Sequence, residues 1–335
     1  HAEDLADACI LASEHKKSFS TYNIGSDDCQ SMRTTLEQLC EYAETGSKIY
    51  SLPRKPIEII MNITSKLRLT PLAPYHAMMY GRSLYFNIDK AKKEINTEGL
   101  KMVEDGKTFF WSGRYHNDMN SRDTLDTQLN VLADFQPVVP SSYKDAKIVM
   151  LGNLHPLVQM SVIEQMDKPE LIVLDTMNFW MDNALEDLKK VIAKVDVITI
   201  NDEEARQLSG EYSLVKAARE IEKMGPDYVV IKKGEHGALL FHKNEMFFAP
   251  ALPLEEVFDP TGAGDTFAGG FVGYLAKTND TSFKNMKNAI IYGSNLASFC
   301  VEKFGTERML NLTDEEIEER LKTFKALTQF KINLD

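Results

Sequence analysis

Short apolar runs alternate with amphipathic segments in the middle of the chain. The runs are rich in β-branched residues, and a polar residue or a glycine follows each of them; they span residues 147–151, 171–174, 197–200 and 228–231. Segments with helical spacing lie between them, at 184–195 and 214–224. Continuous apolar strands alternating with helices are typical of a parallel sheet that is covered on both faces. We therefore predict an α/β domain whose ligand lies beyond the carboxyl ends of these strands.

The pattern changes after residue 237. Residues 238–241 and 246–249 flank a polar turn, which predicts a hairpin at the edge of the sheet. Helical spacing then extends to the end of the chain and predicts helices at 265–276, 285–303 and 314–326. Thr313 has the right position and chemistry to cap the last of these helices.

The first 95 residues have a different character. Their spacing predicts helices at 4–13, 31–44 and 57–67 and a strand at 20–24. They carry 12 basic and 12 acidic residues, so the whole net charge of −12 belongs to the remainder of the chain. This shift in composition favours two segments, 1–95 and 96–335.

The overall composition limits the possible functions. A hydrophobic content of 43% is ordinary for a globular protein, and no apolar run approaches the ~20 residues that a membrane span needs. A net charge of −12 disfavours nucleic acid as a partner. The four cysteines fit neither zinc-binding nor redox spacing and are expected to be reduced thiols: Cys9, Cys29, Cys40 and Cys300. We expect a cytoplasmic protein that binds neither nucleic acid nor membrane.

The most informative segment is Val257-Phe258-Asp259-Pro260-Thr261-Gly262-Ala263-Gly264-Asp265-Thr266-Phe267-Ala268-Gly269-Gly270. Gly262, Ala263 and Gly264 have almost no side chain, so a ligand can approach their backbone N–H groups. These residues stand where a helix begins, and its free N–H groups and dipole favour an anion. Asp265 could accept the proton of an attacking hydroxyl. Gly-x-Gly-Asp alone is equally typical of an ordinary glycine-rich helix start.

The complete segment resembles the C-terminal signature of the ribokinase-like (PfkB) carbohydrate and nucleoside kinases. The resemblance covers about residues 97–330 and implies a three-layer sandwich with a mostly parallel central sheet. It implies ATP and Mg²⁺ as cofactors and Asp265 as the catalytic base, with Gly262, Ala263 and Gly264 forming an anion hole. Asp259 matches the position that binds a monovalent cation such as K⁺ in many members.

Two further motifs occur in the order that this family requires. Asn201-Asp202-Glu203-Glu204 is similar to the Asn-x-x-Glu motif that places Mg²⁺ and phosphates, which gives Asn201 a cofactor role and Glu204 a metal role. Lys232-Lys233-Gly234-Glu235-His236-Gly237 is similar to the family's nucleotide turn, and implies nucleotide contacts for Lys232, Gly234 and Gly237. Alone, the first motif is also a common helix cap and the second an ordinary tight turn. Asn295, on the following helix, is a further candidate on the nucleotide side.

Polar residues elsewhere are candidates for binding the substrate. Arg114 opens a segment, 114–122, that is dense in hydrogen-bonding groups. Asn153 and Asn178 lie at or just past predicted strand ends, and sugar hydroxyls require such groups. Solvation in a loop is the equally weighted alternative for each residue.

The N-terminal segment resembles a different family. Three stretches are similar to the C-terminal part of nucleotide-sugar epimerases of the extended short-chain dehydrogenase family: residues 3–8, 22–26 and 86–94. The Gly-containing first strand, the Gly-Gly motif and the lid expected of the kinase family are not recognisable there. The sequence thus predicts an epimerase-like α/β segment, 1–95, in place of the kinase's N-terminal strands and lid, with the join near 93–97.

Three functions follow from these patterns. The first is an ATP-dependent kinase that moves the γ-phosphate to a hydroxyl of a small sugar or nucleoside. The resemblance also implies a homodimer paired through the lid. The second is a chimeric or truncated chain that binds nucleotide without turnover. The third and most remote is an NAD-dependent sugar-nucleotide epimerase. The sequence does not name the acceptor.

Overall fold

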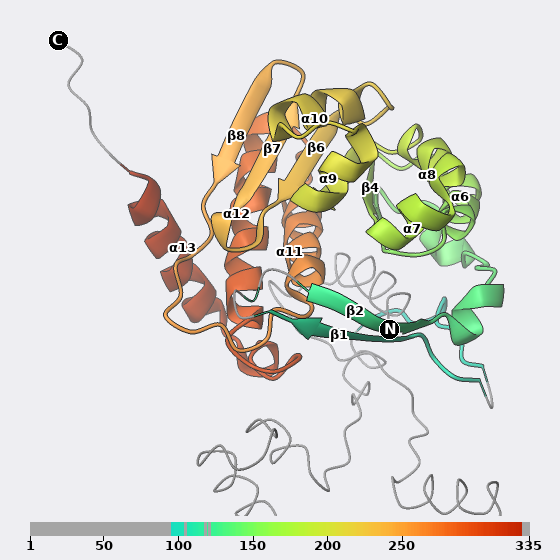
Figure 1. Cartoon of the computed structure of the whole chain (residues 1–335), viewed down its shortest axis with the longest axis horizontal. Helices are drawn as coiled ribbons and strands as arrows, with labels where there is room; N and C mark the ends of the chain where they lie inside the picture. Colours follow the sequence, from blue (N-terminus) through green and yellow to red (C-terminus); the bar gives the residue numbers. More distant parts are fainter. Residues whose placement is uncertain (1–94, 104–105, 117–118, 120–121, 330–335) are drawn as a thin grey trace, which may run out of the picture. The chain divides into compact units, whose positions relative to one another are not determined.

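The computed structural model describes residues 95–329, apart from 104–105, 117–118 and 120–121. The helices and the strand predicted within the first 94 residues lie outside the described part. Six strands form one sheet in the order β3-β4-β5-β6-β7-β8 (Figure 1). Their bounds are β3 (Ile148–Leu151), β4 (Leu171–Asp175), β5 (Val197–Asn201), β6 (Tyr228–Lys232), β7 (Ala238–His242) and β8 (Glu245–Ala249).

The strand directions match the sequence pattern. β3 to β6 pair in parallel, whereas β7 pairs antiparallel with both β6 and β8. The four apolar runs are therefore confirmed as parallel strands, and the predicted edge hairpin is confirmed as β7–β8. Because the parallel strands point the same way, their carboxyl ends meet at one edge of the sheet, where ligands bind in open α/β sheets.

Helices cover both faces of this sheet. One face carries α6 (Pro156–Gln165), α7 (Asn178–Asn183), α8 (Leu185–Ile192), α9 (Asp202–Ser209) and α10 (Leu214–Glu222), and the other carries α11 (Ala263–Thr278) and α12 (Phe283–Cys300). α13 (Asp314–Thr328) packs against α12. The predicted three-layer arrangement is confirmed.

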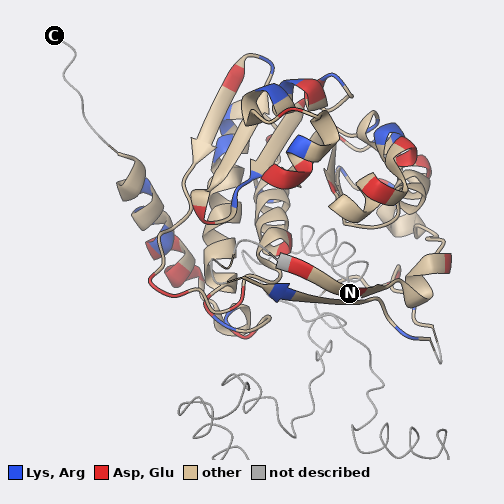
Figure 2. Ribbon diagram, in the orientation of Figure 1, with Lys and Arg blue, Asp and Glu red and all other residues tan. Residues whose placement is uncertain are grey.

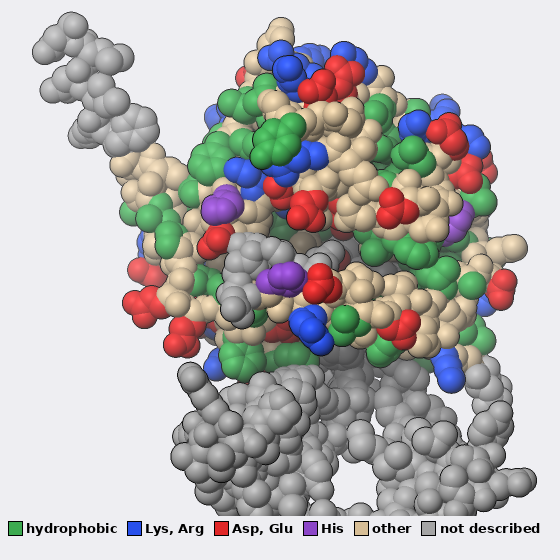
Figure 3. All heavy atoms as spheres, viewed as in Figure 1, with side chains coloured by type: hydrophobic (Ala, Val, Ile, Leu, Met, Phe, Trp, Pro, Cys, Tyr) green, Lys and Arg blue, Asp and Glu red, His purple; other side chains and the backbone are tan. Residues whose placement is uncertain are grey.

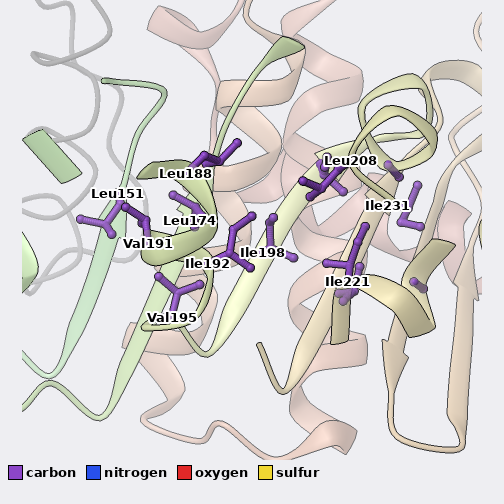
Figure 4. Packing of buried hydrophobic residues seen from close by; sticks show 14 of the residues in the cluster. Leu151, Leu174, Leu188, Val191, Ile192, Val195, Ile198, Leu208, Ile221 and Ile231 are labelled. Carbon is purple, nitrogen blue, oxygen red and sulfur yellow. The ribbon is translucent and has the colours of Figure 1, made fainter. Parts of the chain in front are cut away.

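Alternation along the strands builds the two cores. Leu174 and Ile198 point toward α8, where they meet Leu188 and Ile192, and all four side chains are fully buried (Figure 4). The next residues in each strand point to the opposite face. There Val173 packs in a second cluster with residues of α11 and α12. Strands buried on both faces explain why their sequences read as unbroken apolar runs.

The helix ends follow the local sequence closely. The Thr313 hydroxyl accepts a hydrogen bond from the backbone N–H of Glu316, and the Glu316 carboxylate accepts the backbone N–H of Thr313, which confirms the predicted cap. The helix predicted to run to residue 303 ends earlier, at Cys300. The carbonyl of Val301 instead accepts the N–H groups of Phe258 and Asp259, which belong to the turn before α11.

A separate two-stranded antiparallel sheet was not predicted. β1 (Phe110–Tyr115) pairs with β2 (Arg122–Gln128), with an irregular register between Ser112 and Gly113. Residues 110–115 and 123–128 of this sheet are exposed or half-buried, so the strands lack the apolar alternation that reveals a strand in sequence. The sheet lies on the side of the molecule where α11 begins (Figure 1).

Charged residues sit mainly on the outer faces of the helices, and acidic and basic side chains are interspersed on the face shown in Figures 2 and 3. Pairs three residues apart account for part of this mixture, such as Glu186 with Lys189 on α8. Within the part of the chain that the structure describes, no helix combines the length and apolarity that a bilayer crossing requires.

Candidate active site

The turn from Asp259 to Gly262 (the phosphate turn) leads directly into α11. Gly262 is the residue before the helix and has φ 84°, a left-handed conformation that glycine adopts without steric cost. Ala263, Gly264 and Asp265 form the first turn of α11, and both Gly264 and Asp265 are exposed. The structure therefore brings the predicted base next to the positive end of a helix. The N–H of Ala263 donates to Pro260 O at 3.1 Å, so it is already engaged within the turn.

The phosphate turn is fixed to the end of α12. Asp259 accepts the N–H of Thr261 on Oδ1 at 3.0 Å and the N–H of Gly305 on Oδ2 at 3.3 Å. The Cys300 thiol lies below the turn and donates to Thr261 O at 3.8 Å. Burial, together with the charges of Asp259 and Asp265, raises the pKa of the Cys300 thiol, although a hydrogen bond with Thr266 opposes this shift. The thiol is therefore a packing group at neutral pH.

A row of polar side chains follows the apolar layer that faces α11. Val173, Val197 and Val230 pack in the core beneath α11 and α12. Two residues further along the same strands stand Asp175, Thr199 and Lys232, which alternation places on the same face. Lys232 Nζ donates to Asp175 Oδ1 at 2.9 Å, and the Thr199 hydroxyl donates to the same oxygen at 3.0 Å. The polar row thus reaches the carboxyl edge of the sheet on the side of α11.

Lys232 lies beside the first turn of α11. A Cβ added to Gly264 would stand 3.6 Å from Lys232 Nζ. Burial alone would lower the pKa of Lys232, but the negative charges of Asp175, Glu204 and Asp265 and the hydrogen bond with Asp175 outweigh it and raise the pKa. The side chain therefore carries a positive charge at neutral pH next to the first turn of α11.

Asn201 and Glu204 form a reciprocal cap at the start of α9. Asn201 Oδ1 accepts the N–H of Glu204 at 2.8 Å, and Glu204 Oε2 accepts the N–H of Asn201 at 2.9 Å. The motif therefore forms the helix cap that is the alternative interpretation of its sequence. Glu204 also lies near enough to Lys232 to affect the pKa of the lysine. Within the described ranges, no three His, Cys, Asp or Glu side chains lie close enough together to hold a metal ion by themselves.

The predicted nucleotide turn joins β6 to β7. Lys233 N donates to Gly237 O at 2.8 Å, and Gly237 N donates to Gly234 O at 3.1 Å. Both glycines have positive φ, and a Cβ at Gly237 would lie 2.0 Å from Ala249 O. The turn therefore requires glycine at position 237 for its own geometry.

The other predicted site residues are dispersed. Asn153 Oδ1 accepts the indole N–H of Trp180, and Asn178 donates to Gln207 Oε1. Arg114 is exposed on β1, on the opposite face from Tyr115. Asn295 is completely buried and donates to Ile317 O of α13 at 3.0 Å, which leaves no surface of its side chain to a nucleotide.

Two residues near the site were missed as candidates from sequence. Asp175 could be noted only as a polar strand end, because its partner Lys232 lies 57 residues away. Tyr115 lies within the polar segment 114–122, and its hydroxyl accepts a hydrogen bond from Thr261 of the phosphate turn at 3.3 Å. Only the tertiary fold reveals either contact.

Comparisons with known proteins identify a family that matches most of the chain. Residues 85–313 match the model of the pfkB family carbohydrate kinases. The chain is 31% identical over 184 residues to a cytidine kinase of Thermococcus kodakarensis, covering 53% of this chain and 64% of that protein. It is 32% identical over 131 residues to a ribokinase of Staphylococcus aureus, covering 38% and 41%. A 95-residue stretch is 50% identical to an uncharacterized protein of Sinorhizobium fredii, covering 28% and 24%. The chain thus spans less than two thirds of the length of each of these three relatives.

Solved structures show the same fold. A fructokinase of Vibrio cholerae superimposes with a TM-score of 0.56 at 17% identity, covering 69% of this chain and 79% of that one. A nucleoside kinase of Burkholderia thailandensis superimposes with a TM-score of 0.53 at 19% identity, covering 71% and 76%. The ribokinase-like fold predicted from the sequence is therefore confirmed.

Proposed function

Because the chain belongs to the pfkB family of carbohydrate kinases, we propose that it transfers the γ-phosphate of ATP to a hydroxyl of a sugar or nucleoside. One observation carries this proposal above the others: Asp265 is exposed in the first turn of α11, directly after Gly264 and close behind Gly262 of the phosphate turn. A base and an anion-binding helix end next to each other are what phosphoryl transfer to a hydroxyl requires. The names of the relatives, a cytidine kinase and a ribokinase, support a sugar or nucleoside as acceptor.

The reaction would proceed by in-line displacement. Asp265 accepts the proton of the acceptor hydroxyl, whose oxygen forms a bond to the γ-phosphorus while the bond to the β-phosphate oxygen breaks and ADP leaves. The N–H groups of Gly262 and Gly264 and the dipole of α11 would stabilise the negative charge on the transferred group. Asn201 and the turn that holds Lys232, Gly234 and Gly237 would bind the nucleotide, and Arg114, Asn153 and Asn178 remain the proposed substrate contacts.

Two cations fit the available oxygen donors. Mg²⁺ prefers one or two carboxylates together with phosphate oxygens over a cage built by protein alone. Glu204, one of the three carboxylates whose charge acts on Lys232, would supply such a ligand. Bound there with ATP, Mg²⁺ would neutralise phosphate charge. Asp259 would hold a monovalent cation such as K⁺, since each of its oxygens accepts one N–H from the described residues and has further lone pairs.

The substitution Asp265→Asn tests the proposal. The amide has the same shape but is no base, so we expect turnover of a panel of sugars and nucleosides to fall by about 10²–10⁴-fold. ATP affinity should change little. Asp187→Asn, the same chemical change on α8, is the matched control and should keep full turnover. Full activity of Asp265→Asn would show that the base is assigned wrongly.

The same assay separates the alternatives. A wild-type chain that binds ATP but phosphorylates no member of the panel would favour the truncated-kinase interpretation. Tight binding of NAD would favour the epimerase interpretation.

A further inference from the structure

The ion pair between Lys232 and Asp175 is largely shielded from water. The side chains are 17% and 10% exposed, and 2.9 Å separates Nζ from Oδ1. A buried ion pair contributes little to stability, because the cost of removing two charges from water offsets their attraction. Its place at the carboxyl ends of β4 and β6, the edge where such sheets bind ligands, points to a role in binding instead.

The geometry directs this ammonium at one position of the site. Asp175 and Lys232 lie on the sheet face that α11 covers, with Thr199 of β5 between them. Thr199 donates to the same carboxylate oxygen as Lys232 does, so Asp175 is held from the neighbouring strand. The ammonium is thereby fixed beside Gly264, 3.6 Å from the point where a Cβ would stand.

In the proposed reaction, the position beside Gly264 would face one particular phosphate of ATP. Asp265, the next residue, would act on the acceptor hydroxyl, and this hydroxyl attacks the γ-phosphorus. A cation at Gly264 would therefore face the phosphate that is transferred, whereas the β-phosphate would lie on the leaving-group side. An ammonium donates charge-assisted hydrogen bonds, which are about twice as strong as those between neutral groups.

We infer that Lys232 contacts the γ-phosphate of bound ATP and that Asp175 is a positioning residue that holds the Lys232 ammonium beside Gly264. This inference rests on the proposed function and adds to it the group that distinguishes ATP from ADP. A merely structural pair, which only ties β4 to β6 across β5, would affect folding but would not distinguish the two nucleotides.

The test compares the affinities for ADP and for an ATP analogue whose β,γ-bridge resists transfer, by calorimetry at one fixed Mg²⁺ concentration. We expect the wild type to bind the analogue more tightly than ADP. Lys232→Met should weaken binding of the analogue about tenfold or more and change ADP binding little. Asp175→Asn should also weaken binding of the analogue, but by a smaller factor. Lys232→Arg should retain part of the preference for the analogue over ADP. Lys223→Met removes the same charge at the end of α10, from a side chain 68% exposed, and should change neither affinity.

Removing one partner leaves the other charge buried, so Lys232→Met alone could fold poorly. The double variant Asp175→Asn with Lys232→Met removes both charges, and we expect it to fold and to have lost the discrimination. Equal loss of both affinities, or unchanged discrimination in a folded variant, would overturn the inference. Those results leave the proposed function intact if the wild type phosphorylates an acceptor, whereas a wild type that binds neither nucleotide contradicts both.

Discussion

The Thr261 hydroxyl donates a hydrogen bond to the hydroxyl of Tyr115 at 3.3 Å, across 146 residues of sequence. Tyr115 is the last residue of β1, and Thr261 belongs to the phosphate turn. The two-stranded sheet β1–β2 is thus fixed to the segment that would hold the transferred phosphate. Segments that close over active sites commonly control access of substrate and exclude water.

We predict that Tyr115→Phe loosens this connection. Loss of an exposed hydrogen bond costs about 1 kcal/mol, which corresponds to roughly fivefold faster amide exchange where exchange follows local opening. Hydrogen exchange with mass spectrometry should show the increase in peptides that cover β1. Thr261→Val should give the same increase, and the double variant should add nothing. Tyr212→Phe is the control, since Tyr212 is 86% exposed and stacks under Arg206. Additive effects of Tyr115→Phe and Thr261→Val would show that the two hydroxyls are not coupled.

Two glycines of the phosphate segment should respond differently to alanine. Gly262 has φ 84°, so Gly262→Ala forces a left-handed alanine and should lower the free energy of unfolding by about 1–2 kcal/mol. Gly264 lies in the helix with an ordinary backbone, and its added Cβ would meet only Lys232 Nζ, at 3.6 Å. Gly264→Ala should therefore leave stability unchanged or raise it by about 0.5–1 kcal/mol.

At Gly264, alanine should affect turnover strongly even though it leaves stability intact. A methyl group at Gly264 occupies the space beside the Lys232 ammonium, so Gly264→Ala should abolish ATP-dependent turnover in a chain that is fully folded. Thermal unfolding and the kinase assay on the same preparations test both statements. A stable Gly264→Ala variant with normal turnover would place the transferred phosphate elsewhere.

The sequence predicts the main sheet well because each strand is buried on both faces. Ile198 and Val173, on opposite faces, are both fully buried, and such runs need no knowledge of the tertiary structure to be recognised. The exposed β1–β2 sheet lacks this signal. The end of α12 was also mispredicted, since the tertiary contact of Val301 O with the phosphate turn decides it.

The candidate site also has one part that the sequence predicts and one part that it does not. The Gly262–Asp265 segment is predictable because the glycines, the helix start and the base are consecutive in sequence. The pairing of Lys232 with Asp175 depends on the order of strands in the sheet, which no local pattern contains. The roles assigned to these residues in catalysis stay predictions.

Asn295 offers a test between a nucleotide contact and a packing role. The resemblance to the kinase family implies the first, but the structure buries the side chain completely and joins it to Ile317 O of α13. Nearby, Arg320 of α13 donates to the Ser298 hydroxyl, so α12 and α13 are connected at two points. An amide in this position stabilises the docking of α13 and has no path to a ligand.

We therefore expect Asn295→Ala to lower the free energy of unfolding by about 1–3 kcal/mol, because it removes a buried hydrogen bond and leaves a small cavity. ATP affinity, measured by calorimetry well below the melting temperature, should be unchanged. Asn183→Ala is the matched control: its amide makes the same kind of bond, to Phe179 O at 2.7 Å, at an exposed position, and its removal should cost much less. If Asn295→Ala lost ATP affinity at unchanged stability, the interpretation as a nucleotide contact would be correct. In that case α13 would have to change its position to expose Asn295 to the ligand.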